Sequence, residues 1–345
     1  ADTAGLGVEA SDLDFWQIVN AESDQCDLVM QSIEAPFLLM FTSGTTGPAK
    51  PLEVPLKALI AFGHYMQDAI GLRDDDAFWN IADPGWAYGL YYGITGPLLL
   101  GHATLFYEGG FSADSLCQIV NDYKINNLAG APTAYRMMMA ADQTQMAQLK
   151  GKFRVVSSAG EPLNPEVFRW FQQVLDAPIF DHYGQTEVGM VVCNHHGLKH
   201  EIRAGSAGFA SPGYRVAVVD DQGNELTANT PGILAVDIEQ SPMMWFEGYK
   251  ESRKSPFIKN YYLTGDTAEL NEDGSMSFVG RSDDVITTSG YRIGPFDVES
   301  ALLEHEAVVE AAVIGVPDPE RTEIVKAFVI LAEGQDAGEE LAEQL

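Results

Sequence analysis

Residues 153–187 read FRVVSSAGEPLNPEVFRWFQQVLDAPIFDHYGQTE, and this stretch decides the fold. The apolar run at 153–157 predicts a strand, 165–175 predicts a helix, and the apolar run at 178–181 predicts a second strand. Asn164, directly before the helix, is a favourable cap. A strand, a helix and a strand in this order form the repeating unit of a parallel sheet.

The same alternation extends toward the N-terminus. The run FLLMF at 37–41 predicts a buried strand. Further strands are predicted at 77–81, 103–107 and 126–129, and helices at 56–70, 90–100, 113–123 and 133–140. Strands that alternate with helices predict an α/β domain whose mostly parallel sheet is covered on both faces.

Past residue 205 the pattern changes to short strands separated by turns. Strands predicted at 216–219, 233–238, 261–264 and 276–279 indicate an antiparallel β-subdomain. A helix at 296–304, strands at 308–315 and 324–331, and the start of a helix at 338–345 then indicate a small α+β unit. We therefore expect a large core over residues 1–282 and a small C-terminal domain over residues 283–345.

Composition excludes several kinds of partner. The formal net charge is −30, from 50 acidic and 20 basic residues, which argues against nucleic acid or an anionic membrane surface. No apolar run reaches the roughly 18 residues of a membrane span, and the first residues do not resemble a signal peptide. Cys26, Cys117 and Cys193 are widely spaced and form no CxxC pair, which predicts reduced thiols in a cytoplasmic protein.

A loop rich in Ser, Thr and Gly, TSGTTGPAK at 42–50, follows the first predicted strand. Its glycines allow close approach of the backbone, its hydroxyls can donate hydrogen bonds, and Lys50 adds a positive charge, which together suit a polyphosphate. It is not a Walker A loop, because proline follows Lys50. The alternative is a flexible connection that binds nothing.

Two further clusters follow predicted strands. In DHYGQTE, which ends at Glu187, Tyr183 can stack on a base, Thr186 can bond a phosphate and Glu187 can bind Mg²⁺. In YLTGD, which ends at Asp266, the acid can accept bonds from ribose hydroxyls. The alternatives are a surface glutamate and an aspartate in a turn.

A fourth cluster, GRSDDVI at 280–286 followed by SGYRIG at 289–294, lies where the strand pattern changes again, and surface ion pairs are its alternative explanation. Together the four clusters resemble the adenylate-forming superfamily of acyl-CoA synthetases, luciferases and peptide-synthetase adenylation domains. The resemblance covers residues 37–331 and is greatest to the short- and medium-chain acyl-CoA synthetases. It implies an ATP-dependent acid:CoA ligase that forms an acyl-adenylate and then an acyl-CoA thioester from a small carboxylic acid, with ATP, Mg²⁺ and coenzyme A.

The resemblance also implies a role for each matching residue. The loop that grips the phosphates would comprise Thr42, Ser43, Gly44, Thr45, Thr46, Gly47 and Lys50. Adenine and the α-phosphate would contact Gly160, Glu161, Pro162, Asp181, His182, Tyr183, Gly184, Gln185 and Thr186. The ribose would contact Asp266 and Arg281, Mg²⁺ would contact Thr42 and Glu187, and the CoA path would pass Ser289, Gly290, Tyr291 and Arg321. Lys50, Thr186, Glu187 and Arg292 would be the catalytic residues, and Asp283 would be the hinge at which the C-terminal domain rotates.

Two residues bear on the acid substrate. Trp86 matches a pocket tryptophan of the medium-chain enzymes, and its alternative is a core aromatic residue. Gly184 stands where acetate-specific relatives carry a tryptophan. A glycine there would leave room for more carbons, each worth about 0.8 kcal/mol when buried. We therefore expect an acid larger than acetate.

The chain also departs from the superfamily. Members extend beyond both of its ends, and a late glycine-flanked lysine that acts in adenylation has no match here. A truncated chain would be impaired in adenylation, so a catalytically impaired nucleotide-binding fragment stays an alternative, as does transfer to a carrier-protein thiol. His195, His196 and His200 are expected in a surface loop rather than at a metal. The oligomeric state stays open.

Overall fold

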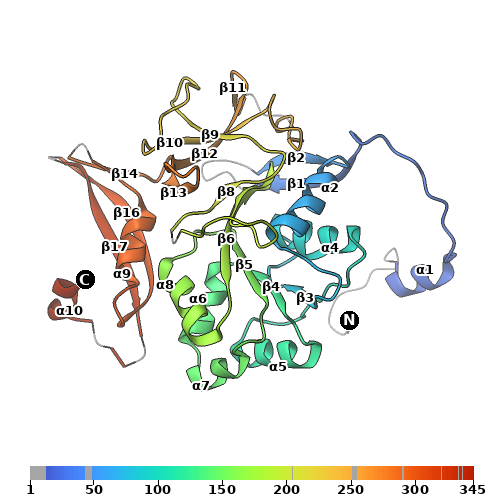
Figure 1. Cartoon of the computed structure of the whole chain (residues 1–345), viewed down its shortest axis with the longest axis horizontal. Coiled ribbons are helices and arrows are strands. Elements are labelled where there is room, and N and C mark those ends of the chain that lie inside the picture. The colour runs from blue at the N-terminus through green and yellow to red at the C-terminus, as the bar shows by residue number, and fades with distance from the viewer. Residues whose placement is uncertain are drawn as a thin grey trace.

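The computed structural model describes residues 13–42, 49–203, 205–250, 255–289, 291–319, 321–332, 334–335 and 337–345, with the side chains of all of these except Arg292 and Glu340. Its centre is a six-stranded sheet in the order β3-β4-β5-β6-β7-β8 (Figure 1). The strands are β3 (Phe78–Asn80), β4 (Asn127–Gly130), β5 (Val155–Ala159), β6 (Ile179–Gln185), β7 (Gly189–Cys193) and β8 (Phe209–Ala210). The run from β3 to β6 is parallel and β7 and β8 are antiparallel, so the predicted mostly parallel sheet is confirmed.

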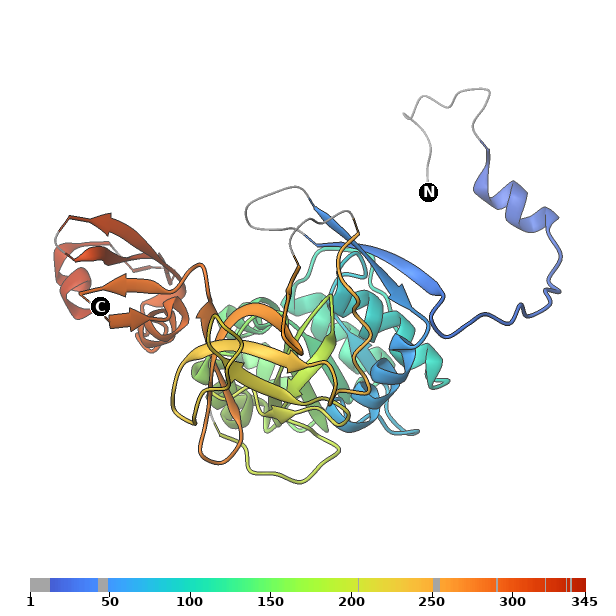
Figure 2. The same ribbon diagram turned by 90° about the horizontal axis from the view of Figure 1, so that it is seen from above.

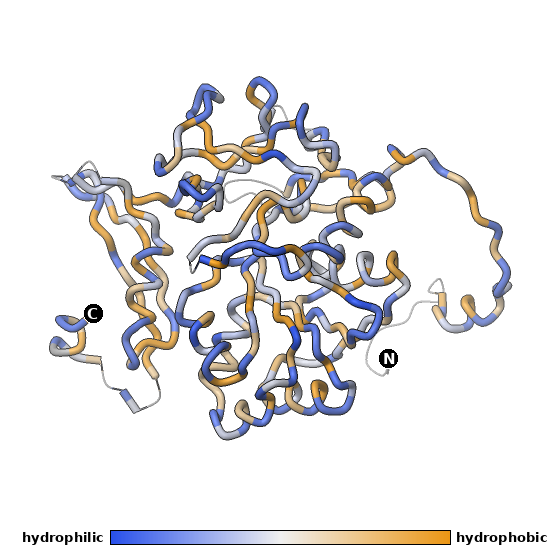
Figure 3. Tube along the Cα trace, in the orientation of Figure 1, coloured by the Kyte–Doolittle hydropathy of each residue, from blue (hydrophilic) through white to orange (hydrophobic). Residues whose placement is uncertain are grey.

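Helices cover both faces of this sheet, as the alternation predicts. One face packs against α5 (Ala113–Tyr123), α6 (Pro132–Ala140), α7 (Gln143–Met146), η3 (Ala147–Leu149), α8 (Pro165–Trp170) and η4 (Phe171–Leu175). The other face packs against α2 (Ala58–His64), η1 (Tyr65–Ala69), α3 (Ala87–Gly89) and η2 (Leu90–Thr95), which runs on into α4 (Gly96–Leu99). Figure 3 shows apolar residues gathered along the central strands. No helix in the described part of the chain has the length and apolar character needed to cross a membrane.

Local sequence explains where α5 begins and which side of it is buried. Ser112 and Ser115 form a reciprocal capping box at its start. Its buried residues, Leu116, Cys117, Ile119 and Val120, recur at helical spacing and therefore share one face. The helix predicted at 113–123 has the observed bounds for this reason.

Two predicted strands differ from the structure. Residues 103–107 belong to no strand, so that prediction is wrong. The run at 37–41 does form β1 (Pro36–Thr42), but β1 pairs with β2 (Lys50–Pro55) in a separate antiparallel sheet, and Phe41 is 61% exposed. An apolar run predicts an extended segment, but it does not specify which neighbour pairs with it or covers it.

The antiparallel β-subdomain is confirmed. It contains β9 (Val216–Val219), β10 (Gly232–Asp237), β11 (Phe257–Ile258), β12 (Tyr261–Leu270) and β13 (Met276–Arg281). Their order is β11-β12-β10-β9, with β13 on β12, and these pairings are antiparallel. Strand β12 is longer than predicted because both of its halves find partners in the ladder.

The C-terminal unit has its own sheet, to one side of the core (Figures 1 and 2). It comprises β14 (Ile286–Thr288), β15 (Tyr291–Ile293), α9 (Pro295–Leu302), β16 (Val308–Asp318), β17 (Thr322–Leu331) and α10 (Glu339–Gln344). At the other end of the chain, α1 (Phe15–Ala21) lies away from the body of the molecule in both views (Figures 1 and 2).

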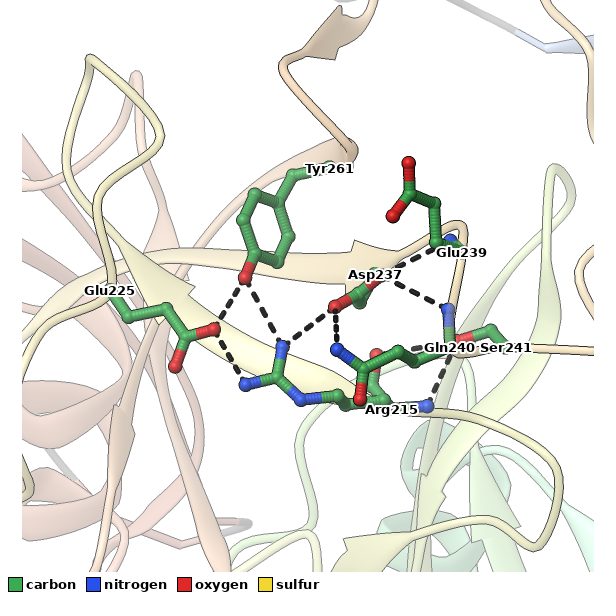
Figure 4. Close-up of polar contacts among 7 residues, drawn as sticks. All are labelled: Arg215, Glu225, Asp237, Glu239, Gln240, Ser241 and Tyr261. Atoms are coloured by element: carbon green, nitrogen blue, oxygen red, sulfur yellow. Dashed lines mark hydrogen bonds and ion pairs between the residues drawn. The ribbon is translucent and has the colours of Figure 1, made fainter.

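Polar contacts hold the β-subdomain together around Arg215 (Figure 4). Its guanidinium donates to Asp237 Oδ2 at 2.9 Å, to Glu225 Oε1 at 2.6 Å and to the Tyr261 hydroxyl at 3.1 Å. Asp237 is fully buried and also accepts from the backbone N–H of Gln240 at 3.1 Å. The arginine therefore neutralises a buried carboxylate and joins β9, β10 and β12.

We expect Arg215→Met to lower the free energy of unfolding by about 3 kcal/mol, because it leaves the Asp237 carboxylate buried without its charged partner. Urea denaturation monitored by tryptophan fluorescence measures this change. Arg169→Met is the control, because its ion pairs with Glu166 and Glu304 are exposed and should contribute less than about 1 kcal/mol. Equal losses in the two variants would contradict the role of burial.

Candidate functional site

A cleft of about 430 Å³ lies where β5 and β6 end, between the core and the C-terminal unit. Ligands of parallel α/β sheets bind at the carboxyl ends of the strands. Predicted residues that line it are Gly160, Glu161, Pro162, Asp181, His182, Tyr183, Gly184, Gln185, Asp266 and Arg281. The structure therefore brings together three of the four sequence clusters.

Two further lining residues, Gly280 and Asp284, belong to the predicted cluster at 280–286 but were given no role of their own. The lining residues that were not predicted are Ala207, Phe278, Pro295, Phe296 and Glu299. Phe296 and Glu299 come from α9, so the C-terminal unit closes one side of the cleft. Their spacing of three residues on a predicted helix places them on one face, and this signal was available in the sequence.

Asp266 is the most densely bonded acid of the cleft. Its Oδ2 accepts from the Tyr183 hydroxyl and from Gln185 Nε2 at 2.8 Å, and its Oδ1 accepts from Arg281 Nη1 at 3.1 Å. We call these four residues the Asp266 cluster. Asp266 is only 4% exposed, and burial raises the pKa of its carboxyl while the bonds from Tyr183 and Arg281 oppose that rise. The cluster joins β6 to β12 and β13 and presents a fixed acceptor to the cleft.

Buried tyrosines support the β6–β7 hairpin from behind. The hydroxyl of Tyr65 lies 2.8 Å from His182 Nδ1, and that of Tyr91 donates to the backbone carbonyl of Thr186 at 3.2 Å. The hydroxyl of Tyr92 accepts from the backbone N–H of Met190 at 3.1 Å. Burial raises the pKa of all three phenols, so they stay neutral donors. The sequence analysis did not single out these three tyrosines.

Glu187 and Lys50 both contact the side chain of Tyr249. The hydroxyl of Tyr249 donates to Glu187 Oε1 at 2.6 Å, and Lys50 Nζ lies 5.0 Å from the centre of the Tyr249 ring. Glu187 is 7% exposed, and burial raises the pKa of its carboxyl while the bond from Tyr249 and the charge of Lys50 oppose that rise. Tyr249 was not predicted.

The oxygen-bearing side chains here suit a hard cation such as Mg²⁺ that a bound nucleotide, rather than the protein, mainly coordinates. No three His, Cys, Asp or Glu side chains in the described part of the chain gather as a metal cage. Mg²⁺ is usually held by one or two carboxylates together with phosphate oxygens and water, and Glu187 meets that need. Thr42, the other predicted metal ligand, lies opposite Lys50 in the β1–β2 ladder.

Two family models match the chain. One, described as AMP-binding enzyme, matches residues 4–249, and the other, described as AMP-binding enzyme C-terminal domain, matches residues 297–345. The chain belongs to the AMP-binding enzyme family. The predicted membership in the adenylate-forming enzymes is thereby confirmed.

Individual relatives agree with this membership. Acetyl-coenzyme A synthetase of Bacillus subtilis is 39% identical over 96% of this chain and 59% of its own length. The crystal structure of Brucella canis acyl-CoA synthetase is 60% identical, with a TM-score of 0.80, over 99% of this chain and 62% of that one. Anthranilate CoA ligase AuaEII, in complex with anthranoyl-AMP, is 27% identical, with a TM-score of 0.88, over 99% of this chain and 64% of that one. This chain thus spans about three fifths of the length of these AMP-binding enzymes.

Several residues predicted from the resemblance lie outside the cleft or outside the described residues. Ser43, Gly44, Thr45, Thr46, Gly47, Gly290 and the side chain of Arg292 are not described. The structure brings Ser289 beside Arg321, whose carbonyl accepts from the Ser289 backbone N–H at 2.9 Å, and Tyr291 is exposed nearby in β15. These three residues do not line the cleft described above. Their contact with CoA stays a prediction.

The two predicted acid-pocket residues are placed differently from each other. Trp86 is 70% exposed, so the alternative of a core aromatic residue is wrong, and Trp86 does not line the cleft. Gly184 lines the cleft, but a Cβ added there would lie 2.3 Å from the Gly189 carbonyl oxygen and 2.7 Å from Met190 Sδ. The close approach of β6 and β7 is therefore enough to require glycine. The extra room that we predicted for the acid stays untested.

The predicted surface loop is confirmed for residues 197–199, which are exposed, but the prediction is wrong for His195. His195 is 3% exposed, and the ring of His196 stacks on Phe180 with centroids 4.0 Å apart. His200 Nε2 accepts from the backbone N–H of His195 at 2.7 Å. Polar residue type alone did not reveal that His195 is buried and that His196 packs on Phe180. Burial lowers the pKa of His195 to about 4 and that of His196 to about 3.

Asp181 is an acid of the cleft whose carboxyl has few polar partners among the described residues. Its Oδ2 accepts from the backbone N–H of Leu163 at 3.4 Å, and its Oδ1 has no hydrogen-bond partner among the described residues. Burial raises the pKa of this carboxyl to about 8. At neutral pH it is therefore a neutral group that can donate as well as accept.

We expect Asp181→Asn to change how stability depends on pH. Because the folded-state pKa of Asp181 is raised, the folded protein keeps a proton on Asp181 that the unfolded chain releases between about pH 4 and pH 8. The free energy of unfolding therefore falls as the pH rises through that window. The variant lacks this term, so its free energy of unfolding relative to the natural chain should increase from about pH 5 to pH 8. Urea denaturation at several pH values measures this, with the exposed Asp122→Asn as control. A difference that is the same at every pH would refute it.

Proposed function

We propose that this chain carries the nucleotide site of an ATP-dependent acid:CoA ligase that forms an acyl-adenylate and then an acyl-CoA thioester. The observation that supports this most is the Asp266 cluster at the carboxyl end of β6, in a member of the AMP-binding enzyme family. The cluster offers a fixed carboxylate to hydroxyls of a nucleoside, and Arg281 adds a positive charge beside it. Transfer to a carrier-protein thiol and nucleotide binding without turnover are the alternatives.

The chemistry requires two displacements. The acid's carboxylate oxygen attacks the α-phosphorus of ATP, the bond to the β-phosphate breaks, and pyrophosphate leaves. The thiol of CoA then attacks the acyl carbon, AMP leaves, and the thiol proton is released to water. Lys50 offers a positive charge for the phosphates, and Mg²⁺ near Glu187 would offset the charge on pyrophosphate. The Asp266 cluster orients the nucleoside in both displacements.

For the substrate we propose a short- or medium-chain acid larger than acetate. The relatives act on acids of different size, as the names acetyl-coenzyme A synthetase and anthranilate CoA ligase state. Thioester formation measured over a series of straight-chain acids tests this, and a maximum at acetate would contradict it. We also propose a cytoplasmic location, which the free thiols of Cys26, Cys117 and Cys193 support.

We further propose that residues 283–345 move as a unit about Asp283. Polar contacts between this unit and the core include the bond from Asn164 Nδ2 to Ser300 Oγ at 3.0 Å and the ion pairs Arg169–Glu304 at 3.1 Å and Arg281–Asp283 at 3.4 Å. Asn164 is the N-cap residue of α8, as predicted, but its side chain makes no capping bond and contacts α9 instead.

If this contact restrains the unit, Asn164→Ala should speed amide hydrogen exchange in α9 and leave β4 and β5 unchanged. Mass spectrometry of the exchanging peptides gives the measurement. Asn121→Ala, whose side chain bonds only within the core through the Cys117 carbonyl and Lys152, is the control. Equal protection of α9 in both variants would remove support for the restraint.

The nucleotide site itself is tested by Asp266→Ala. Removing a buried acceptor that should bond the ribose, and that also fixes Tyr183 and Arg281, should weaken ATP binding about tenfold or more. Isothermal titration of the purified chain with ATP and Mg²⁺ gives the affinity, and Asp221→Ala, in an exposed turn, is the control. Unchanged affinity would place the nucleotide elsewhere. Acid-dependent exchange of pyrophosphate into ATP, followed by CoA-dependent AMP release, then separates ligase activity from binding alone and from carrier-protein transfer.

A further inference from the structure

Tyr249 occupies a fixed place between two elements that come from distant parts of the sequence. The backbone N–H of Lys250 donates to the Pro51 carbonyl at 2.9 Å, which aligns this segment with β2. The Lys250 side chain pairs with Glu53 at 2.9 Å on the same strand. The Tyr249 ring packs edge-on against the buried Phe246 ring, with centroids 5.0 Å apart. Both the main chain and the ring of Tyr249 are therefore held.

The two ends of the Tyr249 side chain serve different partners. Lys50 Nζ lies 5.0 Å from the ring centre, within the range of a cation–π contact. A ring face attracts an ammonium group without using up its N–H donors, so Lys50 keeps them for an anionic ligand. The hydroxyl donates to Glu187 Oε1 at 2.6 Å, and a carboxylate can accept this bond while its remaining lone pairs face a cation.

We propose that Tyr249 is a positioning residue for the phosphate end of the nucleotide site, holding Lys50 through its ring and Glu187 through its hydroxyl. The proposal rests on the proposed function, because it assumes that ATP and Mg²⁺ bind at Lys50 and Glu187. Orienting Glu187 before the cation arrives raises the affinity for the cation, as bonds to metal ligands from neighbouring side chains generally do. Restricting Lys50 beforehand lowers the entropy lost when it binds phosphate.

The two contacts can be removed separately. Tyr249→Phe keeps the ring and loses the hydroxyl, so the Mg²⁺ concentration that half-saturates ATP binding should rise about tenfold. ATP binding in EDTA, which depends on Lys50 and not on the cation, should change by less than about twofold. Tyr249→Leu loses both contacts, so ATP binding in EDTA should also weaken, by about fivefold. If Tyr249 acted only by packing, Tyr249→Phe would not raise the Mg²⁺ requirement while sparing ATP binding in EDTA.

Tyr261→Phe is the matched control. Tyr261 also donates its hydroxyl to a glutamate, Glu225, but within the Arg215 network of the β-subdomain (Figure 4). Loss of the Tyr261 hydroxyl should lower the melting temperature about as much as Tyr249→Phe does. It should leave unchanged both the Mg²⁺ concentration that half-saturates ATP binding and the affinity for ATP in EDTA. If Tyr249→Phe and Tyr261→Phe show the same dependence on Mg²⁺, the proposal is overturned while the nucleotide site stands.

Glu187→Gln provides a second route if Tyr249→Phe folds poorly. Alone it should raise the Mg²⁺ requirement and spare ATP binding in EDTA. Adding Tyr249→Phe to it should raise the requirement by less than about twofold, because the hydroxyl acts through Glu187. Independent, multiplied effects of the two substitutions would overturn the proposal. If the natural chain binds no ATP with or without Mg²⁺, the proposed function fails, and this proposal fails with it.

Discussion

The bonds around the Asp266 carboxylate are the interaction on which the rest of the site depends, because they connect parts of the fold that share no continuous sheet. Tyr183 and Gln185 come from the central α/β sheet, whereas Asp266 and Arg281 come from neighbouring strands of the β-subdomain. An acid buried this deeply would be strongly unfavourable if its oxygens were unpaired. The subdomain must therefore dock where all three donors reach Asp266, and that docking forms one wall of the cleft.

Once this contact is fixed, the positions of the other groups follow. Strand β6 carries Asp181 and Tyr183 into the cleft, and Glu187 lies in the turn that joins β6 to β7. The phenols of Tyr91 and Tyr92, both from η2, bond the backbone of the same hairpin. The hairpin is thus bonded both to the β-subdomain and to η2, which restricts its movement.

Sequence was a good guide wherever one local pattern decides a structure. The βαβ unit at 153–187, the helix at 113–123 and the three clusters in the cleft were predicted because apolar period, capping and motif spacing are local. The exposure of Phe41, the burial of His195 and the place of Tyr249 depend on which remote segment packs there. The bond between Tyr249 and Glu187 joins residues that are far apart in sequence and share no motif, so neither could predict the other.

The acidic composition helps to explain why tyrosines recur at these positions. With 50 acidic and 20 basic residues, the chain has too few cations to pair each of its carboxylates. Tyr183, Tyr249 and Tyr261 each donate a hydroxyl to a carboxylate, on Asp266, Glu187 and Glu225 respectively. Asp266 and Glu225 also accept from an arginine, whereas the phenol of Tyr249 satisfies an oxygen of the buried Glu187 without adding a charge where desolvation would be costly. The charge of Lys50 is then not consumed by an ion pair with Glu187, which accepts from a neutral phenol instead.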